Sequence, residues 1–541
     1  MSVLTEELDK EIKKRRTFAI ISHPDAGKTT LTEKLLLYGG AIHLAGSIKS
    51  RKTQRHAVSD WMEIEKQRGI SVTSSVLQFD YEDCRINILD TPGHQDFSED
   101  TYRTLMAVDS AVMVIDVAKG VEAQTKKLFK VCKQRGIPIF TFVNKLDHYG
   151  KLPIDLMDEI ETVLGIRSYP MNWPIGTDGQ YLGVYDRQEK KINLFTEDTS
   201  HGQTARVADT YTLDDPALIA RIGQETHAAL KDDLELLDEA GESFDLEKIA
   251  AGELTPMYFG SAMTNFGVQD FLEGYIKLAP TPAPRNSSVG LIEPNDDKFS
   301  AFVFKIQANM NPAHRDRLAF IRICSGKFER NMNVWHERSA KVIKLAQPQQ
   351  FLAQDRQIID TAYPGDIVGL FDPGIFGIGD TICEPSKKFK FADFPVFPPE
   401  KFARVQAKDT MKRKQFVKGI EQLTQEGAIQ LFCQAGAGLD SYIVGTVGTL
   451  QFEVLEYRLK NEYNVDIEMV MQPFEVARWL AFEDGRNVTP ESLKGTDRGM
   501  FVYDREENPV LLVSNEWALG WIKDNNPDII LGHVPFDRKE A

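Results

Sequence analysis

The chain has 541 residues, 42% of them hydrophobic and 27% charged, which is typical of a globular protein with about three or four domains. The N-terminus alternates charges, and the longest apolar stretches are too short to cross a bilayer, so we expect neither a secretory signal nor a membrane span. Five widely spaced cysteines without a C-x-x-C pair argue against zinc or disulfides and predict a cytoplasmic location. The net charge of −16 disfavours non-specific nucleic-acid binding, so any contact with RNA must come from local basic patches.

The first 150 residues alternate short apolar strands with amphipathic helices, which predicts an α/β domain with buried parallel strands. The expected strands are 17–22, 72–81, 85–90, 110–117 and 137–145, and the expected helices are 28–38 and 123–135.

The middle of the chain is less regular. A hairpin is expected at 181–185 and 191–195, an acidic helix at 216–239 and a strand at 257–260. Pro-rich linkers at 279–285 and 387–399 flank a stretch of short strands with Gly and Pro turns, 299–384, which predicts a β-barrel.

The last third begins with a recognisable order of elements. Residues 402–470 read strand, helix, strand, strand, helix, strand, the order of a ferredoxin-like split βαβ unit. The aromatic-rich segment 471–541 has no clear assignment. The expected domains are therefore 1–284, with an inserted subdomain at about 150–255, then the barrel at 285–390 and a C-terminal domain at 391–541.

A phosphate-binding loop is expected between the first strand and the first helix. The segment fits G-x-x-x-x-G-K-[ST], except that serine replaces the first glycine. Backbone N–H groups at the start of a helix attract an anion, lysine reaches the phosphates and a hydroxyl ligates Mg²⁺. The candidate nucleotide-binding residues are Ser22, His23, Pro24, Asp25, Ala26, Gly27, Lys28 and Thr29. An ordinary turn before a helix is the competing interpretation.

A second motif, Asp90-Thr91-Pro92-Gly93, ends a predicted strand, where ligands of α/β sheets gather. Asp90 can hold Mg²⁺ through water, and the Gly93 N–H can sense a γ-phosphate that is present only before hydrolysis. His94 follows directly and is the candidate catalytic residue, placed to position the attacking water.

Base recognition is expected from Asn144-Lys145-Leu146-Asp147, at the end of the next strand. A carboxylate accepts from both N1–H and the 2-amino group of guanine, whereas adenine would leave it unpaired. Asn144 would tether the loop and Lys145 would pack along the base. The segment Ser261-Ala262-Met263 is expected to close the base pocket through its backbone.

A conformational switch is expected between the first two motifs. In Arg68-Gly-Ile-Ser71, the Ser71 hydroxyl would complete a Mg²⁺ shell of Thr29, Ser71 and Asp90 only when the γ-phosphate is present. The preceding segment, 39–67, should then be mobile with GDP and ordered with GTP. It contains a basic run, 49–56, which could contact RNA or could be a solvated loop.

These motifs, D-A-G-K-T-T, R-G-I-S, D-T-P-G-H and N-K-x-D, together resemble those of the translational GTPases. The resemblance implies binding of GTP or GDP with Mg²⁺, His94 at the family's catalytic histidine, and the ribosome, its RNA and proteins, as partner. It also implies the architecture of elongation factor G and its relatives: a P-loop GTPase domain with an inserted subdomain, a β-barrel and a ferredoxin-like domain. We expect a monomer without membrane contacts.

Within that family the chain most resembles a branch that acts in translation termination, in which R-G-I-S carries serine in place of threonine. The resemblance implies a ribosome-stimulated GTPase that removes the decoding release factor after peptide release. About 70 residues follow the ferredoxin-like unit, too few for the two further domains of a translocase. A translocase or rescue factor, or a free-standing P-loop GTPase, remain the alternatives.

Overall fold

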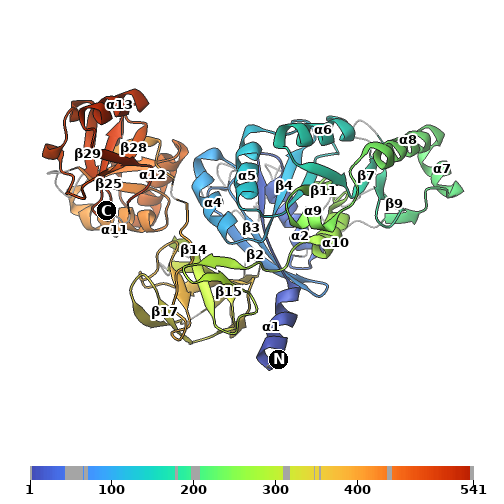
Figure 1. The fold of residues 1–541 in the computed structure, drawn as a ribbon. Helices are drawn as coiled ribbons and strands as arrows, with labels where there is room; N and C mark the ends of the chain where they lie inside the picture. The colour runs from blue at the N-terminus through green and yellow to red at the C-terminus, as the bar shows by residue number, and fades with distance from the viewer. Residues whose placement is uncertain are drawn as a thin grey trace.

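The computed structural model describes most of the chain (Figure 1). The described residues are 3–42, 65, 71–176, 181–195, 208–308, 317–345, 348–352, 355–395, 397–434 and 442–536. Most of the expected switch segment 39–67, including its basic run, and Arg68, Gly69 and Ile70 lie outside them.

A twisted, mainly parallel sheet forms the centre of the N-terminal domain. Its seven strands lie in the order β2-β3-β1-β4-β5-β11-β6, and only β2 runs antiparallel to its neighbour. The strands are β1 (Arg15–Ser22), β2 (Ser75–Tyr81), β3 (Cys84–Asp90), β4 (Ser110–Asp116), β5 (Ile139–Asn144), β6 (Arg167–Pro170) and β11 (Leu254–Phe259). The expected strands of this region all occur, with ends that shift by one to three residues.

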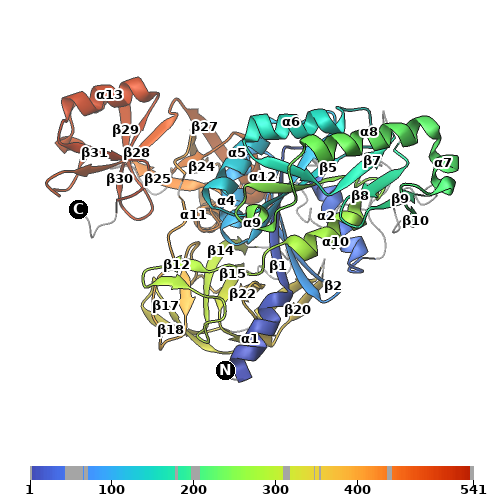
Figure 2. The ribbon, with the colours of Figure 1, turned by 45° about the vertical axis from the view of Figure 1, so that its right-hand side comes forward.

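Helices cover both faces of this sheet, because its strands are apolar on both sides. On one face, α2 (Lys28–Tyr38) and α10 (Val268–Leu278) enclose one hydrophobic cluster. On the other, α4 (Ser98–Met106), α5 (Ala123–Gln134) and α6 (Pro153–Leu164) enclose a second. A helix that the sequence analysis did not anticipate, α1 (Val3–Lys14), precedes β1 and extends along the barrel (Figure 2).

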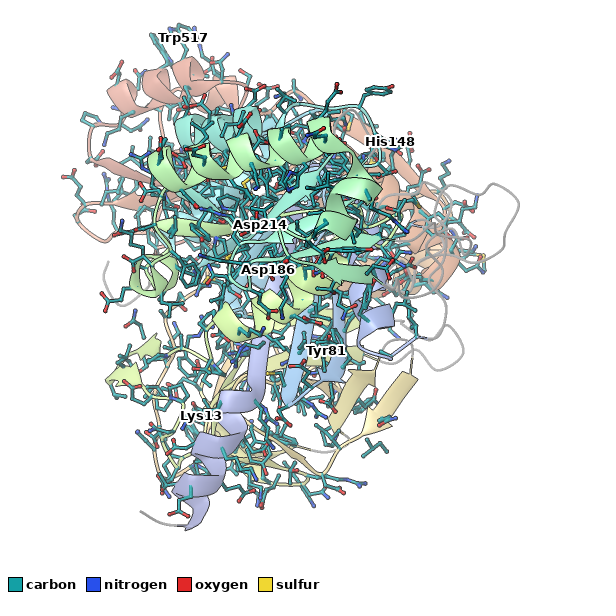
Figure 3. All side chains as sticks on the ribbon, turned by 90° about the vertical axis from the view of Figure 1, so that its right-hand side faces the viewer. Lys13, Tyr81, His148, Asp186, Asp214 and Trp517 are labelled. Atoms are coloured by element: carbon teal, nitrogen blue, oxygen red, sulfur yellow. The ribbon has the colours of Figure 1, made fainter. Side chains whose placement is uncertain are left out.

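An inserted part projects from the end of this domain that lies away from the C-terminal domain (Figures 1 and 3). It contains a four-stranded antiparallel sheet, in which the expected hairpin pairs β8 with β9. The expected helix 216–239 is two helices, because Gly223 at φ 85° interrupts it. The elements are β7 (Asn172–Ile175), β8 (Gly183–Asp186), β9 (Lys191–Phe195), β10 (Ala208–Tyr211), α7 (Pro216–Ile222), α8 (Gln224–Ala240) and α9 (Leu246–Ala250).

The middle of the chain forms the β-rich body below the central parallel sheet in Figure 1. Its long antiparallel pair, β14 (Ser300–Ala308) and β15 (Arg317–Ser325), continues into β22 (Ile367–Phe371) around a core of its own. The other strands are β12 (Arg285–Ser287), β13 (Gly290–Ile292), β16 (Phe328–Glu329), β17 (Asn333–His336), β18 (Lys341–Lys344), β19 (Pro348–Leu352), β20 (Asp355–Ile358), β21 (Thr361–Ala362) and β23 (Thr381–Cys383).

The C-terminal domain is built on one eight-stranded sheet, in the order β27-β24-β26-β25-β29-β30-β28-β31. Its first half has the ferredoxin-like order of elements: β24 (Lys401–Ala407), α11 (Arg413–Gln425), β25 (Gln430–Gln434), β26 (Tyr442–Thr446), α12 (Leu450–Tyr463) and β27 (Ile467–Gln472). The unassigned segment supplies the other half: β28 (Val476–Phe482), β29 (Gly499–Tyr503), β30 (Pro509–Val513), α13 (Glu516–Asn525), whose Trp517 is exposed, and β31 (Ile529–Gly532). Nowhere in the described parts is a helix long and apolar enough to traverse a bilayer.

Candidate nucleotide-binding site

The sequence motifs meet at one edge of the central sheet because parallel strands end together there. Ser22 ends β1, Asp90 ends β3 and Asn144 ends β5, while Ser261 lies two residues beyond β11. These strand ends surround a cavity of about 360 Å³. The residues that line it are Ser22, His23, Pro24, Asp25, Gly27, Lys28, Thr29, Thr30, Ser71, Gly93, His94, Asn144, Lys145, Asp147, His148 and Met263.

The loop between β1 and α2 turns tightly at two positions in the left-handed region. Asp25 has φ 65° and Gly27 has φ 94°. A Cβ on Gly27 would lie 2.2 Å from the Asn144 Nδ2, so this position requires glycine. Ser22 is not a positive-φ residue and its hydroxyl donates to the carbonyl of His23, 2.8 Å away, which explains why glycine is unnecessary there.

The N-terminus of α2 opens into the cavity. Lys28 is the first residue of the helix, and Gly27 before it offers no side-chain cap. The positive end of the helix dipole and the Lys28 ammonium therefore act at the same place. Gly93 completes this region, since a Cβ there would lie 3.3 Å from the Lys28 Nζ.

Asn144 links two of the loops. Its Nδ2 donates to the Ala26 carbonyl at 2.8 Å, and its Oδ1 accepts from the Ala262 N–H at 2.9 Å. Asp147 is tied to the same segment, because its Oδ1 accepts from the Ser261 hydroxyl at 2.5 Å. The structure thus brings the N-K-x-D motif and the Ser261–Met263 segment together, as the sequence analysis expects.

Lys145 connects the phosphate-binding loop to β4. It adopts φ 69°, and its ammonium donates to the Asp25 carbonyl. The same ammonium donates to the carboxylate of Asp116, at the end of β4, at a distance of 2.8 Å. Burial opposes the charge of Asp116, but the hydrogen bonds from Lys145 and from the Ala118 N–H outweigh it and lower the pKa of that carboxyl. Asp116 belongs to none of the sequence motifs, so the sequence analysis missed it. Its position as a carboxylate at the end of a strand is the one feature that could have indicated a role in the site.

Some predicted residues support the cavity rather than line it. Thr91 is buried and its hydroxyl donates to the Ile20 carbonyl at 2.7 Å. The Leu146 N–H donates to the Gly260 carbonyl at 3.2 Å. The remaining members of this buried group are Ala26, Asp90, Pro92, Ser261 and Ala262. Their backbone and packing hold the four strand-end loops in place.

His94 lies on the wall of the cavity, after the Asp90–Gly93 motif. It caps a short 3-10 helix, η1 (Gln95–Phe97), because its Nδ1 accepts from the Asp96 N–H at 3.2 Å. The carboxylate of Asp96 also lies 3.3 Å from Nδ1. Asp96, which no motif includes, was missed by the sequence analysis.

Three family models match the chain. Residues 13–281 match "Elongation factor Tu GTP binding domain", 298–385 match "Elongation factor G domain 2" and 391–523 match "Class II release factor RF3, C-terminal domain". A crystal structure of a protein from Thermus thermophilus is similar in fold, with a TM-score of 0.68 at 21% identity, over 87% of this chain and 69% of that one. These matches confirm the predicted GTPase, barrel and C-terminal architecture.

Curated relatives match almost the full length. A peptide chain release factor 3 from Symbiobacterium thermophilum is 59% identical over 97% of this chain and 98% of its own length. Those of Listeria innocua and Gloeothece citriformis are 55% and 53% identical, each over 98% of this chain and 99% and 97% of their own lengths. With its GTP-binding domain and its RF3-type C-terminal domain, the chain belongs to the peptide chain release factor 3 family, the GTP-hydrolysing factors of translation termination.

Proposed function

We propose that this protein is a ribosome-stimulated GTPase that promotes dissociation and recycling of the decoding, class I release factor after peptide release. The observation that carries the proposal is the meeting of four strand-end loops around one cavity of about 360 Å³, with His94 on its wall. Its partners are then the ribosome and, through it, the decoding release factor. It works as a single chain in the cytoplasm.

The phosphates of GTP would lie at the N-terminus of α2, where the helix dipole and Lys28 favour negative charge. Gly93, close to the Lys28 ammonium, would contact the terminal phosphate and respond to its loss. Segments tied to Gly93 would then differ between the GTP and GDP states.

The donor set fits a magnesium ion. Thr29 and Ser71 line the cavity with hydroxyl oxygens, and Asp90 lies buried at the end of β3. Mg²⁺ prefers such oxygen ligands together with phosphate oxygens, and when bound it neutralises phosphate charge. Ser71 keeps the hydroxyl that threonine supplies in related factors.

Asp147 would select guanine. Its carboxylate is held by the Ser261 hydroxyl at 2.5 Å, which fixes its direction in the cavity wall. A base lacking the N1–H and 2-amino donors would leave that carboxylate desolvated without partners, which costs affinity. Lys145 would pack along the base while its ammonium stays paired with Asp116.

His94 would position the attacking water. In this role it acts on the transition state and not on ground-state binding. The test compares GTP hydrolysis by the wild type and His94→Ala, with and without empty ribosomes, alongside fluorescent-GDP binding. We expect ribosomes to accelerate the wild type, and His94→Ala to bind normally but lose about 100-fold or more of the stimulated rate.

The matched control is His533→Ala, at an exposed histidine of the C-terminal domain, which should hydrolyse GTP like the wild type. Equal loss of binding and turnover in His94→Ala would make His94 structural. A wild-type rate without ribosomes as high as with them would contradict the proposed activation.

A further inference from the structure

The segment after β3 contacts the C-terminal domain. Asp96, in η1, is only 6% exposed, and its Oδ2 accepts from the backbone N–H of Leu450 at 2.8 Å. Leu450 is the first residue of α12, whose own N-cap residue, Thr449, makes no side-chain cap. The carboxylate of Asp96 therefore caps α12 from another domain, where an anion is favoured by the helix dipole.

The fit around Asp96 is close. A Cβ on Gly448 would lie 2.0 Å from the Asp96 Cγ, so the C-terminal domain presents bare backbone at this point. Next to it, Phe97 packs with Val72 and with Val454 of α12 in a small cluster of buried side chains. Val72 directly follows Ser71, so both segments that flank the cavity contact α12.

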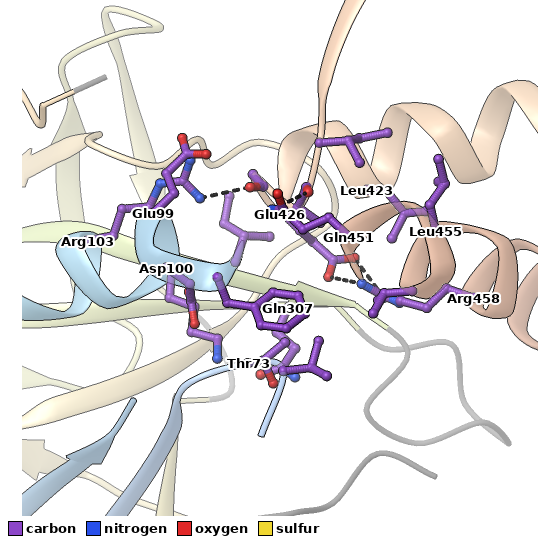
Figure 4. A pocket seen from close by; sticks show the side chains of 18 residues that line it. Thr73, Glu99, Asp100, Arg103, Gln307, Leu423, Glu426, Gln451, Leu455 and Arg458 are labelled. Carbon is purple, nitrogen blue, oxygen red and sulfur yellow. Dashed lines mark hydrogen bonds and ion pairs between the residues drawn. The ribbon is translucent and has the colours of Figure 1, made fainter. Parts of the chain in front are cut away.

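A second set of contacts lies along α4. Arg103 donates to the Gly427 carbonyl at 3.1 Å, in the turn after α11. A small pocket of about 60 Å³ lies between these surfaces. Figure 4 shows Glu99 and Arg103 on one side of this pocket and Arg458 on the other. Asp96 and Arg103 thus attach the same domain, but only Asp96 also touches the histidine.

The same residue holds His94. The Asp96 N–H donates to Nδ1 of the ring, and the Asp96 carboxylate lies 3.3 Å from the same nitrogen, so Asp96 contacts this edge of the ring through both its backbone and its side chain. In this arrangement Nδ1 is not available to a water molecule. The His94 ring is therefore hydrogen-bonded to η1, and η1 is hydrogen-bonded to the start of α12.

We propose that Asp96 is a positioning residue that restrains His94 while the C-terminal domain is docked and releases it when that domain moves. This inference rests on the proposed role of His94. When the contact to Leu450 breaks, η1 loses its attachment and the ring can leave its capping position. Docking of the C-terminal domain then suppresses hydrolysis before the ribosome is engaged.

The test is single-turnover GTP hydrolysis without ribosomes. Asp96→Ala removes the contact to Leu450 and should raise the rate by about ten-fold or more, the scale of one lost charge-assisted hydrogen bond. GTP affinity should not change. Asp96→Asn keeps an oxygen that accepts from Leu450 and should restore most of the restraint. Gly448→Ala displaces the carboxylate from the other side of the contact and should also raise the rate.

Two further variants distinguish an effect on the position of the His94 ring from a general loosening of the contact between the domains. Adding His94→Ala to Asp96→Ala should abolish the gain, since the gain passes through the ring. Arg103→Ala weakens the same junction without touching η1, so it should lower thermal stability but change the rate less than two-fold.

The inference is overturned if Asp96→Ala and Gly448→Ala bind GTP normally yet hydrolyse it no faster than the wild type, or if the gain persists without His94. If instead ribosomes fail to stimulate the wild type, or His94→Ala retains the stimulated rate, the proposed function itself fails. The two failures are therefore distinguishable.

Discussion

At the scale of single residues, Asp270 is an acid outside the cavity whose pKa is strongly raised. It lies on α10 beside the inserted sheet, where the Asn193 amide donates to it at 3.3 Å. Burial, followed by the nearby charges of Asp186 and Glu273, raises its pKa from 3.8 to about 7. The folded protein therefore keeps a proton at Asp270 that the unfolded chain releases.

This difference makes stability depend on pH. Between about pH 4 and pH 7 the folded state binds more protons, so the free energy of unfolding should fall as pH rises. One pKa unit corresponds to about 1.4 kcal/mol, so the full effect has a ceiling of roughly 4 kcal/mol, and partial solvent contact reduces it to about 1–2 kcal/mol.

Asp270→Asn should remove that slope and be more stable than the wild type at pH 8, because no charge has to be buried. Urea denaturation across pH 4 to pH 8 measures it. Near pH 4 the two proteins should be about equally stable, which is the internal control. A gain of the same size at both ends of the range would show that packing, and not ionisation, causes it.

At the scale of elements, apolar runs and turn residues were sufficient to predict most helices and strands near their observed ends. The helix α2 and the strand β9 match their expected bounds, 28–38 and 191–195. α1 was missed because its charged residues outnumber its apolar ones and its stability comes from contacts elsewhere, such as Glu7 with Tyr363 at 2.5 Å. Segment 471–541 could not be assigned because its strand β29 pairs with β25, about 70 residues earlier in the chain.

The candidate site shows the same limit. Motifs located the loops around the cavity, because each loop carries its own residue pattern at a strand end. Asp96 carries no pattern, and its partner Leu450 is 354 residues away, so only the folded chain brings them together. The expected mobility of 39–67 stays a prediction, since most of that segment lies outside the described residues.

The phosphate-loop turn can be tested through Gly27. Gly27→Ala places a Cβ against the Asn144 amide. This amide cannot move away because it is hydrogen-bonded to both Ala26 and Ala262. With φ 94° the alanine is also strained, at a cost of about 1–3 kcal/mol. Fluorescent-GDP titration should show affinity reduced by at least about ten-fold.

Gly136→Ala is the matched control. Gly136 also has a positive φ, 64°, but nothing lies within 4 Å of its Cβ position. It should lose a similar amount of stability and keep nucleotide affinity. Equal loss of affinity in both variants would trace the effect to general destabilisation.

At the scale of the whole molecule, the GTPase sheet and the barrel are joined by buried charges. Asp109 is 3% exposed and pairs with Arg322 of β15 at 2.5 Å and with Arg285 at 3.2 Å. Arg15 of β1 pairs with Asp366 at 3.0 Å in the same interface. Since separating these groups would leave buried charges without their partners, we expect the two domains to move as one body.

Asp109→Ala should therefore destabilise the protein by about 3–5 kcal/mol, because it leaves two buried guanidinium groups without their carboxylate. Calorimetry should show the single transition of the joined domains shift down or split in two. Asp80→Ala, which breaks the exposed Asp80–Arg85 pair, should cost less than about 1 kcal/mol. Similar losses in both variants would contradict the proposed role of the buried pair.

The C-terminal domain is attached differently. Its contacts with the GTPase domain include two backbone groups, the Leu450 N–H and the Gly427 carbonyl, beside a small cavity. We expect such a junction to open at lower cost than the one around Asp109. A molecule with one rigid pair of domains and one domain that can separate from it would be suited to converting the state of a nucleotide into a movement on a partner.

We propose that GTP hydrolysis by this protein serves release-factor recycling. The decisive measurement is dissociation of a fluorescently labelled class I release factor from ribosomes after peptide release. With GTP and substoichiometric protein, the wild type should clear the labelled factor from many ribosomes in turn. With GDP alone, or with His94→Ala and GTP, repeated turnover should be lost. Dissociation at one rate with GTP, with GDP and without the protein would contradict the account.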